Sequence, residues 1–114
     1  MLYSSKKHIG CNAYDDLLKH IDKIIRFKTQ LDLRAFRTIL EHSKTLTYIN
    51  DYFTIPENYY KTLIDLNKKA NYLFLLSIKY NLTQSENLIF KIRKYTLEYI
   101  NDQKNILNKI YSYI

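Results

Sequence analysis

The segments Thr54-Ile55-Pro56-Glu57 and Thr83-Gln84-Ser85-Glu86 decide the fold of this chain of 114 residues. Both match the capping box, in which a threonine hydroxyl accepts from an early N–H of a helix and a glutamate three residues later reaches back. Pro56 falls at or near the first helical position, where its missing N–H is not needed. Two marked helix starts in a chain with one glycine predict an all-α fold.

Apolar residues recur at helical spacing in the first half of the chain, in two segments that we predict as helices. The first helix follows an N-cap at Asn12, and the second runs from a cap at Asp32 to about Asn50. Residues 1–12 show no such period and hold the glycine, so we predict a flexible N-terminal arm there.

The second half predicts two longer helices, at about 56–80 and from about residue 84 to near the C-terminus. Residues 51–55 and 81–82 are the expected connections. Short connections make neighbouring helices antiparallel. We therefore predict an up-down antiparallel four-helix bundle, formed by residues 13–114 as a single domain.

The composition indicates a chain with a real core, since 46% of the residues are apolar. Its single cysteine, Cys11, excludes an intramolecular disulfide and is typical of a reducing compartment. The N-terminus lacks the apolar stretch of a signal peptide, and the longest apolar run, at 72–78, is too short to span a bilayer. We expect a soluble cytoplasmic protein with no membrane partner.

The net charge of +7 and the pI near 9.4 favour a polyanionic partner such as RNA, with DNA as a second possibility. Lysine outnumbers arginine 14 to 4, and asparagine, isoleucine and tyrosine are abundant. An AT-rich genome produces the same bias, so the charge has two explanations at this stage.

The candidate nucleic-acid-binding residues are basic side chains on the second, third and fourth predicted helices. They can release counterions on contact with phosphates, and arginine's planar fork suits phosphate best. The alternative is an ordinary solvated face. On the first helix Lys19, Lys23 and Arg26 are balanced by nearby aspartates. The candidates are Arg34, Arg37, Lys61, Lys68, Lys69, Lys79, Lys91, Arg93 and Lys94.

The twelve tyrosines allow two interpretations. Their rings could stack on unpaired bases. However, Tyr59, Tyr95 and Tyr99 fall on predicted core faces, where a ring packs and its hydroxyl reaches the rim. We therefore favour packing for these three, and an oligomer interface for Tyr111 and Tyr113.

No constellation in the sequence indicates catalysis or a cofactor. His20 follows Asp16 by one helical turn, but two ligands do not make a metal site. Cys11 precedes the predicted first helix without an identified base to activate it. The chain also has no phosphate-cradling glycine loop and no HExxH pattern. We expect a protein that is not an enzyme, with no catalytic, cofactor or metal site.

Several of these segments resemble the accessory variability determinant (Avd) proteins of diversity-generating retroelements, and the related four-helix bundles encoded in 23S rRNA intervening sequences. The resemblance covers about residues 13–100. It is carried by Tyr14-Asp15-Asp16-Leu17-Leu18 with Ile21, Lys23 and Ile24, by Asn67-Lys68-Lys69, by Tyr72-Leu73-Phe74-Leu75-Leu76-Ser77-Ile78, and by Leu82-Thr83.

This resemblance implies a non-enzymatic protein that forms a ring-like homo-oligomer, pentameric in the retroelement branch, and binds a reverse transcriptase and its template RNA through a basic surface. The leading hypothesis is accordingly an Avd-like accessory protein that scaffolds RNA. The alternative is a helical module for protein–protein interaction, in which the basic charge is incidental. A small DNA-binding regulator is a weaker third reading, because no helix-turn-helix sequence is recognisable.

Overall fold

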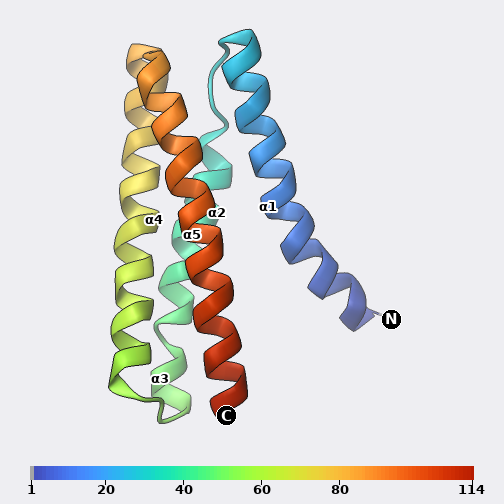
Figure 1. The fold of residues 1–114 in the computed structure, drawn as a ribbon, viewed down its shortest axis with the longest axis vertical. Helices are drawn as coiled ribbons and strands as arrows, with labels where there is room; N and C mark the ends of the chain where they lie inside the picture. The colour runs from blue at the N-terminus through green and yellow to red at the C-terminus, as the bar shows by residue number, and fades with distance from the viewer. Residues whose placement is uncertain (1) are drawn as a thin grey trace.

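The computed structural model describes the backbone of residues 2–114 and the side chains of residues 14–114. Its four long helices alternate in direction, and a single-turn helix lies at the bend between the second and the third of them (Figure 1). The elements are α1 (Leu2–Phe27), α2 (Leu33–Leu46), α3 (Ile49–Tyr52), α4 (Glu57–Thr83) and α5 (Glu86–Tyr113). The predicted all-α up-down four-helix bundle is confirmed.

The bundle is organised around α4 and α5. α4 packs against both α2 and α5, and α1 packs against α5. Residues at three- and four-residue spacing form one continuous core, in which Phe36, Leu63 and Ile92 are completely buried. α1 diverges from α5 toward its N-terminal end (Figure 1). Its buried contacts come from Leu17, Ile21 and Ile24, whereas Phe27, the last residue of α1, is exposed.

The capping boxes predicted for α4 and α5 do not form. The N-cap residues are Pro56 and Ser85, and neither helix has a side-chain cap hydrogen bond. Thr83 belongs to α4, where its hydroxyl donates to the carbonyl of Lys79 at 2.9 Å. The connection is therefore Gln84-Ser85 and not 81–82. Gln84 takes a left-handed conformation (φ 56°), and its N–H bonds the carbonyl of Tyr80, which closes α4 later than predicted.

The predicted cap at Asp32 is confirmed, because its carboxylate accepts from the backbone N–H of Arg34 at 3.0 Å. α2 ends at Leu46, before the predicted Asn50. There the backbone N–H of Thr47 bonds the carbonyl of Lys44, three residues back, and tightens the last turn. The loop predicted at 51–55 begins instead at Phe53, since α3 takes up its first two residues.

The prediction that helix one starts after Asn12 is wrong. α1 begins at Leu2, so Asn12 lies inside the helix. Residues 2–11 contain no proline, and a glycine within a helix costs only about 1 kcal/mol. Nothing in this stretch therefore prevents the helix from continuing. The side chains of His8 and Cys11 lie outside the described part of the chain, and the flexibility of residues 1–12 stays a prediction.

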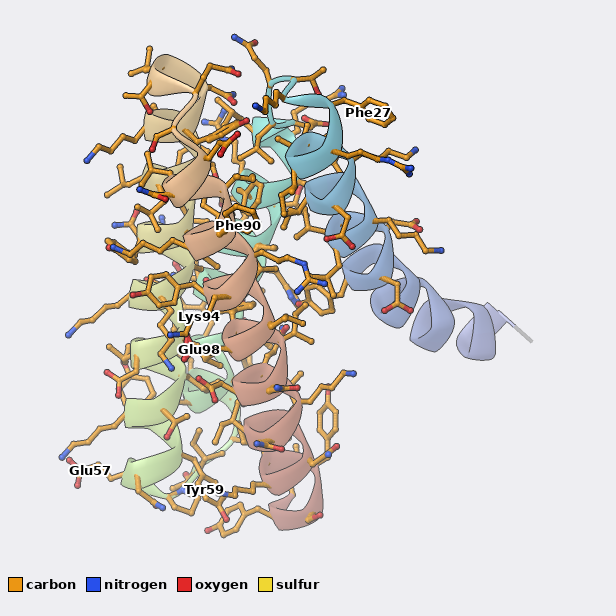
Figure 2. All side chains as sticks on the ribbon, turned by 45° about the horizontal axis from the view of Figure 1, so that its top comes forward. Phe27, Glu57, Tyr59, Phe90, Lys94 and Glu98 are labelled. Atoms are coloured by element: carbon orange, nitrogen blue, oxygen red, sulfur yellow. The ribbon has the colours of Figure 1, made fainter. Side chains whose placement is uncertain are left out.

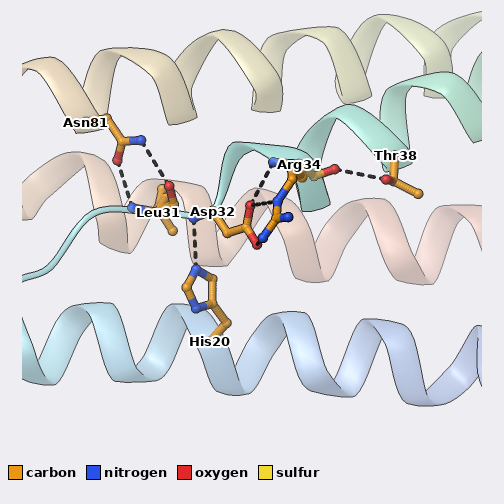
Figure 3. A network of polar contacts seen from close by, with 6 residues as sticks. All are labelled: His20, Leu31, Asp32, Arg34, Thr38 and Asn81. Carbon is orange, nitrogen blue, oxygen red and sulfur yellow. Dashed lines mark hydrogen bonds and ion pairs between the residues drawn. The ribbon is translucent and has the colours of Figure 1, made fainter.

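Side chains of α1 and α4 hold the loop between α1 and α2 through hydrogen bonds to its backbone (Figure 3). Asn81 on α4 accepts from the N–H of Leu31 at 2.8 Å and donates to its carbonyl at 3.0 Å. His20 on α1 accepts from the N–H of Asp32 through Nε2 at 3.0 Å. Because Leu31 is buried, these bonds satisfy backbone groups that have limited access to water.

A second group of polar side chains crosses the middle of the bundle. Gln103 on α5 is buried; its Oε1 accepts from the hydroxyl of Tyr14 on α1, and its Nε2 bonds Nδ1 of His42 on α2 at 3.1 Å. Close by, Asn67 on α4 donates to Ser43 on α2 at 3.0 Å. Hydrogen bonds between side chains therefore link α1 to α5, α5 to α2, and α2 to α4.

Tyr99 on α5 is completely buried, which confirms its predicted core position, but its hydroxyl is buried too and does not reach the rim as predicted. Burial raises the pKa of its phenol well above the usual range, and the hydroxyl of Ser43 has a smaller, opposite effect. Within the described part of the chain, no group completes a hydrogen bond with this phenolic oxygen. The ring therefore contributes to the core through packing.

The bond between Gln103 and His42 predicts a pH-dependent stability. Tyr14 donates to Oε1 of Gln103, so Nε2 is the end that meets His42, and the ring must accept in its neutral form. Burial lowers the pKa of His42 below its usual 6.5. Between the folded and unfolded pKa values the unfolded chain binds more protons, so the free energy of unfolding should decrease as pH falls through that window.

Replacement of His42 by asparagine, whose Oδ1 can accept in place of Nδ1, should remove this part of the pH dependence. Urea unfolding of both proteins, in steps from about pH 7.5 to pH 5, measures the difference. The wild-type protein should lose more stability over the range than H42N. Parallel curves for the two proteins would mean that His42 is not held neutral by the fold.

Candidate nucleic-acid interface

Three connected clefts follow the seam between α4 and α5. The largest, about 570 Å³, shares Lys69 with a second of about 280 Å³, and shares Tyr59 and Lys109 with a third of about 400 Å³. These clefts follow one another along the seam, and we refer to the three together as the α4–α5 groove. It is lined by Asn58, Tyr59, Thr62, Asp65, Leu66, Lys68, Lys69, Tyr72, Leu73, Tyr95, Glu98, Asp102, Asn105, Ile106, Asn108, Lys109, Ser112 and Tyr113.

Helical periodicity places these side chains at the seam. Leu66 and Leu73 are seven residues apart on α4 and buried, and the exposed Lys69 and Tyr72 lie between them at the edge that faces α5. On α5, Tyr95 and Asp102 share the edge that faces α4 at the same spacing. The antiparallel arrangement brings these edges together and leaves their polar and aromatic ends facing solvent.

Aromatic rings occur at both ends of the groove. Tyr72 and Tyr95 lie 5.7 Å apart between ring centroids, and Tyr59 and Tyr113 lie 6.2 Å apart in an edge-to-face arrangement. The predicted core position of Tyr59 and Tyr95 is half right, because both are partly buried and both line the groove. Figure 2 shows Tyr59 at the end of the bundle where α4 begins.

The two helices that form this seam carry a net positive charge. Together α4 and α5 carry nine lysine and arginine residues and five aspartate and glutamate residues. Their excess of four positive charges is more than half of the net charge of the chain. The lining of the groove holds three lysines and three acidic residues, so the positive excess lies on exposed side chains outside the three clefts, such as Lys91 and Lys94.

Several of the basic side chains predicted to bind nucleic acid form ion pairs with aspartate or glutamate. Lys69 bonds Asp102 across the groove. Arg93 bonds Asp22 of α1 at 2.7 Å, and Lys61 lies 3.8 Å from Glu57. Such exposed pairs contribute about 0–1 kcal/mol and exchange readily for phosphate. Among the described side chains, Arg37, Lys68, Lys79, Lys91 and Lys94 form no ion pair.

The structure brings only part of the predicted set together. Lys68 and Lys69 line the groove, and Lys91 contacts the rings of Tyr72 and Tyr95. Lys94 lies next to Glu98 on α5 (Figure 2). Lys61 and Lys79 share a helix face with Lys68, at spacings of seven and eleven residues, but they line none of the three clefts.

Arg34 and Arg37 are exposed on α2 and line none of the three clefts. Arg34 bonds both carboxylate oxygens of Asp32, the residue that caps its own helix (Figure 3). The pKa of Arg34 is raised and that of Asp32 is lowered, in both cases mainly by the hydrogen bond between them. This pairing gives Arg34 a local structural role.

Sequence reasoning missed Lys109 and the polar residues between the lysines. Lys109 lines two of the clefts, together with Asn105 and Asn108. The sequence feature that could have indicated Lys109 is its spacing from Asp102, because a separation of seven residues places both side chains on one face of α5. That spacing acquires a meaning only once α4 is known to lie opposite.

Two other expectations concern metals and membranes. His20 is used to hold the backbone of Asp32. Among the described side chains, no three histidine, cysteine, aspartate or glutamate residues are grouped as a metal site requires. Within residues 2–114, none of the helices combines the length and apolar character needed to cross a bilayer.

No protein-family model, no curated protein and no solved structure matches this chain. The resemblance to Avd proteins therefore stays a prediction from the sequence.

Proposed function

We propose that this protein is a non-enzymatic accessory protein that binds single-stranded RNA along the α4–α5 groove. The observation that carries the proposal is the row of clefts along this seam, in which exposed lysines lie between tyrosine rings at the two ends. Single-strand binding sites combine these two features, since cations follow the backbone and aromatic faces accept bases. A groove of this kind needs no catalytic group.

The resemblance to Avd proteins suggests the setting. In this proposal the protein acts in the cytoplasm and presents template RNA to a reverse transcriptase. A ring-like homo-oligomer, pentameric by the same resemblance, would repeat the groove around its circumference. Repetition raises the avidity for a long RNA without any new type of contact.

Fluorescence polarisation tests the proposal directly. A labelled single-stranded RNA is titrated with the protein at several salt concentrations, with duplex DNA in excess as the competitor. We expect RNA binding that survives the competitor and weakens steeply with salt, because each phosphate contact releases counterions. Binding that disappears at physiological salt would contradict the proposal and leave the genomic bias as the explanation of the charge.

The groove predicts which charges matter. Reversal of Lys68 and Lys69 to glutamate should weaken RNA binding by about a hundredfold or more, since two favourable contacts become repulsive. Circular dichroism should show unchanged helical content, because both side chains are exposed.

Two variants control for this result. The pair K19E and K23E makes the same change in charge on exposed positions of α1, and it should cost much less affinity. D102N breaks the ion pair of Lys69 without adding negative charge, and it should bind RNA at least as tightly as the wild-type protein. Equal losses of RNA affinity in K68E/K69E and in K19E/K23E would place the binding outside the groove.

One observation favours the alternative, a module for protein–protein interaction. Leu75 and Leu82 on α4, and Phe90 and Leu97 on α5, are exposed and seven residues apart within each pair. Each pair forms a short apolar stripe on an outer helix face. Analytical ultracentrifugation of L75S/L82S and F90S/L97S variants tests whether either stripe joins copies of the chain. A changed oligomeric state with unchanged RNA affinity would assign the stripes to assembly.

A further inference from the structure

The smallest of the three clefts in the α4–α5 groove is lined mainly by aromatic and apolar side chains. This cleft, of about 280 Å³, lies beside Tyr72 and Leu73 on α4 and Tyr95 on α5. Leu73 is buried, whereas Tyr72 is 45% exposed. The two tyrosine rings contact each other, with centroids 5.7 Å apart and planes inclined by 51°. An aromatic ligand in the cleft would therefore stack on one ring and not between the two.

Lys91 lies against the same ring pair. Its Nζ is 5.9 Å from the centroid of Tyr72 and 5.8 Å from that of Tyr95. It precedes Tyr95 by one helical turn, while the cleft lies on the side toward Glu98, which follows Tyr95. The rings therefore separate a fixed positive charge from a mainly apolar cleft. A nucleotide needs this division, because its phosphate is charged and its base is not.

The other two lining side chains disfavour a phosphate inside the cleft. Glu98 is an acid, and the ammonium group of Lys69 is already bonded to Asp102. The interior therefore carries little net positive charge. The carboxylate of Glu98, which lines this mainly apolar cleft, can only accept hydrogen bonds. Its preferred partner is a ring whose edge carries N–H donors.

We infer that the cleft lined by Tyr72 and Tyr95 binds one unpaired base of a single-stranded RNA, with guanine preferred and the adjacent phosphate on Lys91. The inference rests on the proposed function and adds a base preference to it. The base stacks on one of the two tyrosine rings. Guanine presents N1–H and the 2-amino group side by side, which matches the two oxygens of Glu98. Uracil presents a single N–H between two carbonyl oxygens, and these repel a carboxylate.

The test uses single-stranded uridine oligomers of about twelve nucleotides that differ only at one central position. Fluorescence polarisation at moderate salt compares guanine, adenine, cytosine and uracil at that position. We expect the guanine oligomer to bind about tenfold more tightly than the all-uridine oligomer, the effect of one good bidentate base contact. E98Q should abolish most of this preference, because an amide offers a donor and an acceptor to any base.

The ring contribution is tested with Y72L and Y95L, and Y111L serves as the control. Each change removes a ring and keeps apolar bulk, and Tyr111 is an exposed tyrosine of α5 that lines none of the three clefts. Y72L and Y95L should each weaken binding of the guanine oligomer about tenfold. Y111L should bind like the wild-type protein. Circular dichroism of each variant verifies its fold, and Tyr72 is exposed enough for Y72L to fold.

The outcomes separate the two claims. Tight, salt-dependent binding of all four oligomers with equal affinity, unaffected by Y72L and Y95L, would overturn the base site and leave the RNA-binding proposal intact. Failure of the wild-type protein to bind any oligomer would overturn both. A preference for guanine that persists in E98Q would show that Glu98 does not read the base, and would overturn its assigned role.

Discussion

Replacement of Asn81 by alanine should lower the free energy of unfolding by about 2–4 kcal/mol. The side-chain amide of Asn81 accepts from the backbone N–H of Leu31 and donates to its carbonyl, and Leu31 is buried. A buried donor or acceptor left without a partner costs about 1–3 kcal/mol. Proteins of this size are stable by about 5–15 kcal/mol in total. Urea unfolding followed by circular dichroism measures the change.

Two further variants isolate the cause. N71A removes an exposed asparagine from the same helix, and it should be neutral or slightly stabilising because alanine is the better helix former. N81D keeps an oxygen that can accept from Leu31 and loses the donor, so its stability should fall between those of N81A and the wild-type protein. If N81A and N71A have the same stability, water replaces Asn81 at no cost and the loop is not held by this residue.

The core of the bundle could be predicted from periodicity because apolar burial dominates the folding of a chain like this one. The apolar period on α4 predicts seven inward positions, of which Leu63, Leu66, Ala70, Leu73 and Ser77 are buried and Tyr59 and Phe74 are partly buried. Ser77 fits because its hydroxyl donates to the carbonyl of Leu73, so no buried polar group is left unpaired. A helical pattern therefore tolerates a short polar side chain at a core position.

Helix ends could not be predicted as well, since they depend on single backbone conformations. α1 and α4 are each followed by a non-glycine residue at positive φ, Lys28 and Gln84. This conformation costs roughly 1 kcal/mol without glycine, and no residue preference announces it. Lys28 also bonds Glu86 at 2.8 Å, which joins the end of α1 to the start of α5. Tertiary contacts of this kind override a local capping signal.

The candidate interface was only partly visible in the sequence because a groove belongs to two helices at once. Lys68 and Lys69 could be found from composition and spacing on one helix. The seam itself, with Lys109 and the Tyr72–Tyr95 pair, requires the pairing of α4 with α5. Arg34 illustrates the opposite error, since an arginine that suits phosphate serves here to bind its neighbour Asp32.

Replacement of Gln103 by alanine should lower the free energy of unfolding by about 3–5 kcal/mol. Gln103 is buried and its amide joins Tyr14 on α1 to His42 on α2. Its removal leaves two polar groups without their partner and also creates a cavity. Burial raises the pKa of the Tyr14 phenol, with an opposite, smaller effect of Gln103, so this group stays protonated and needs an acceptor. Urea unfolding measures the loss of stability, and hydrogen exchange should show the earliest opening in α1.

Q103L separates the two causes, because leucine fills most of the volume and makes no hydrogen bond. If the polar groups dominate, Q103L should be nearly as unstable as Q103A, and Y14F should restore part of its stability by removing one unpaired hydroxyl. Recovery by Y14F is specific to the pair, since the same change in the wild-type protein removes a satisfied bond and should destabilise it. A Q103L protein as stable as the wild type would show that α1 is held by the burial of Leu17, Ile21 and Ile24 alone. The hydrogen bonds of Gln103 with Tyr14 and His42 would then set the register of the helices without adding stability. This is the other role that buried polar groups take in bundles.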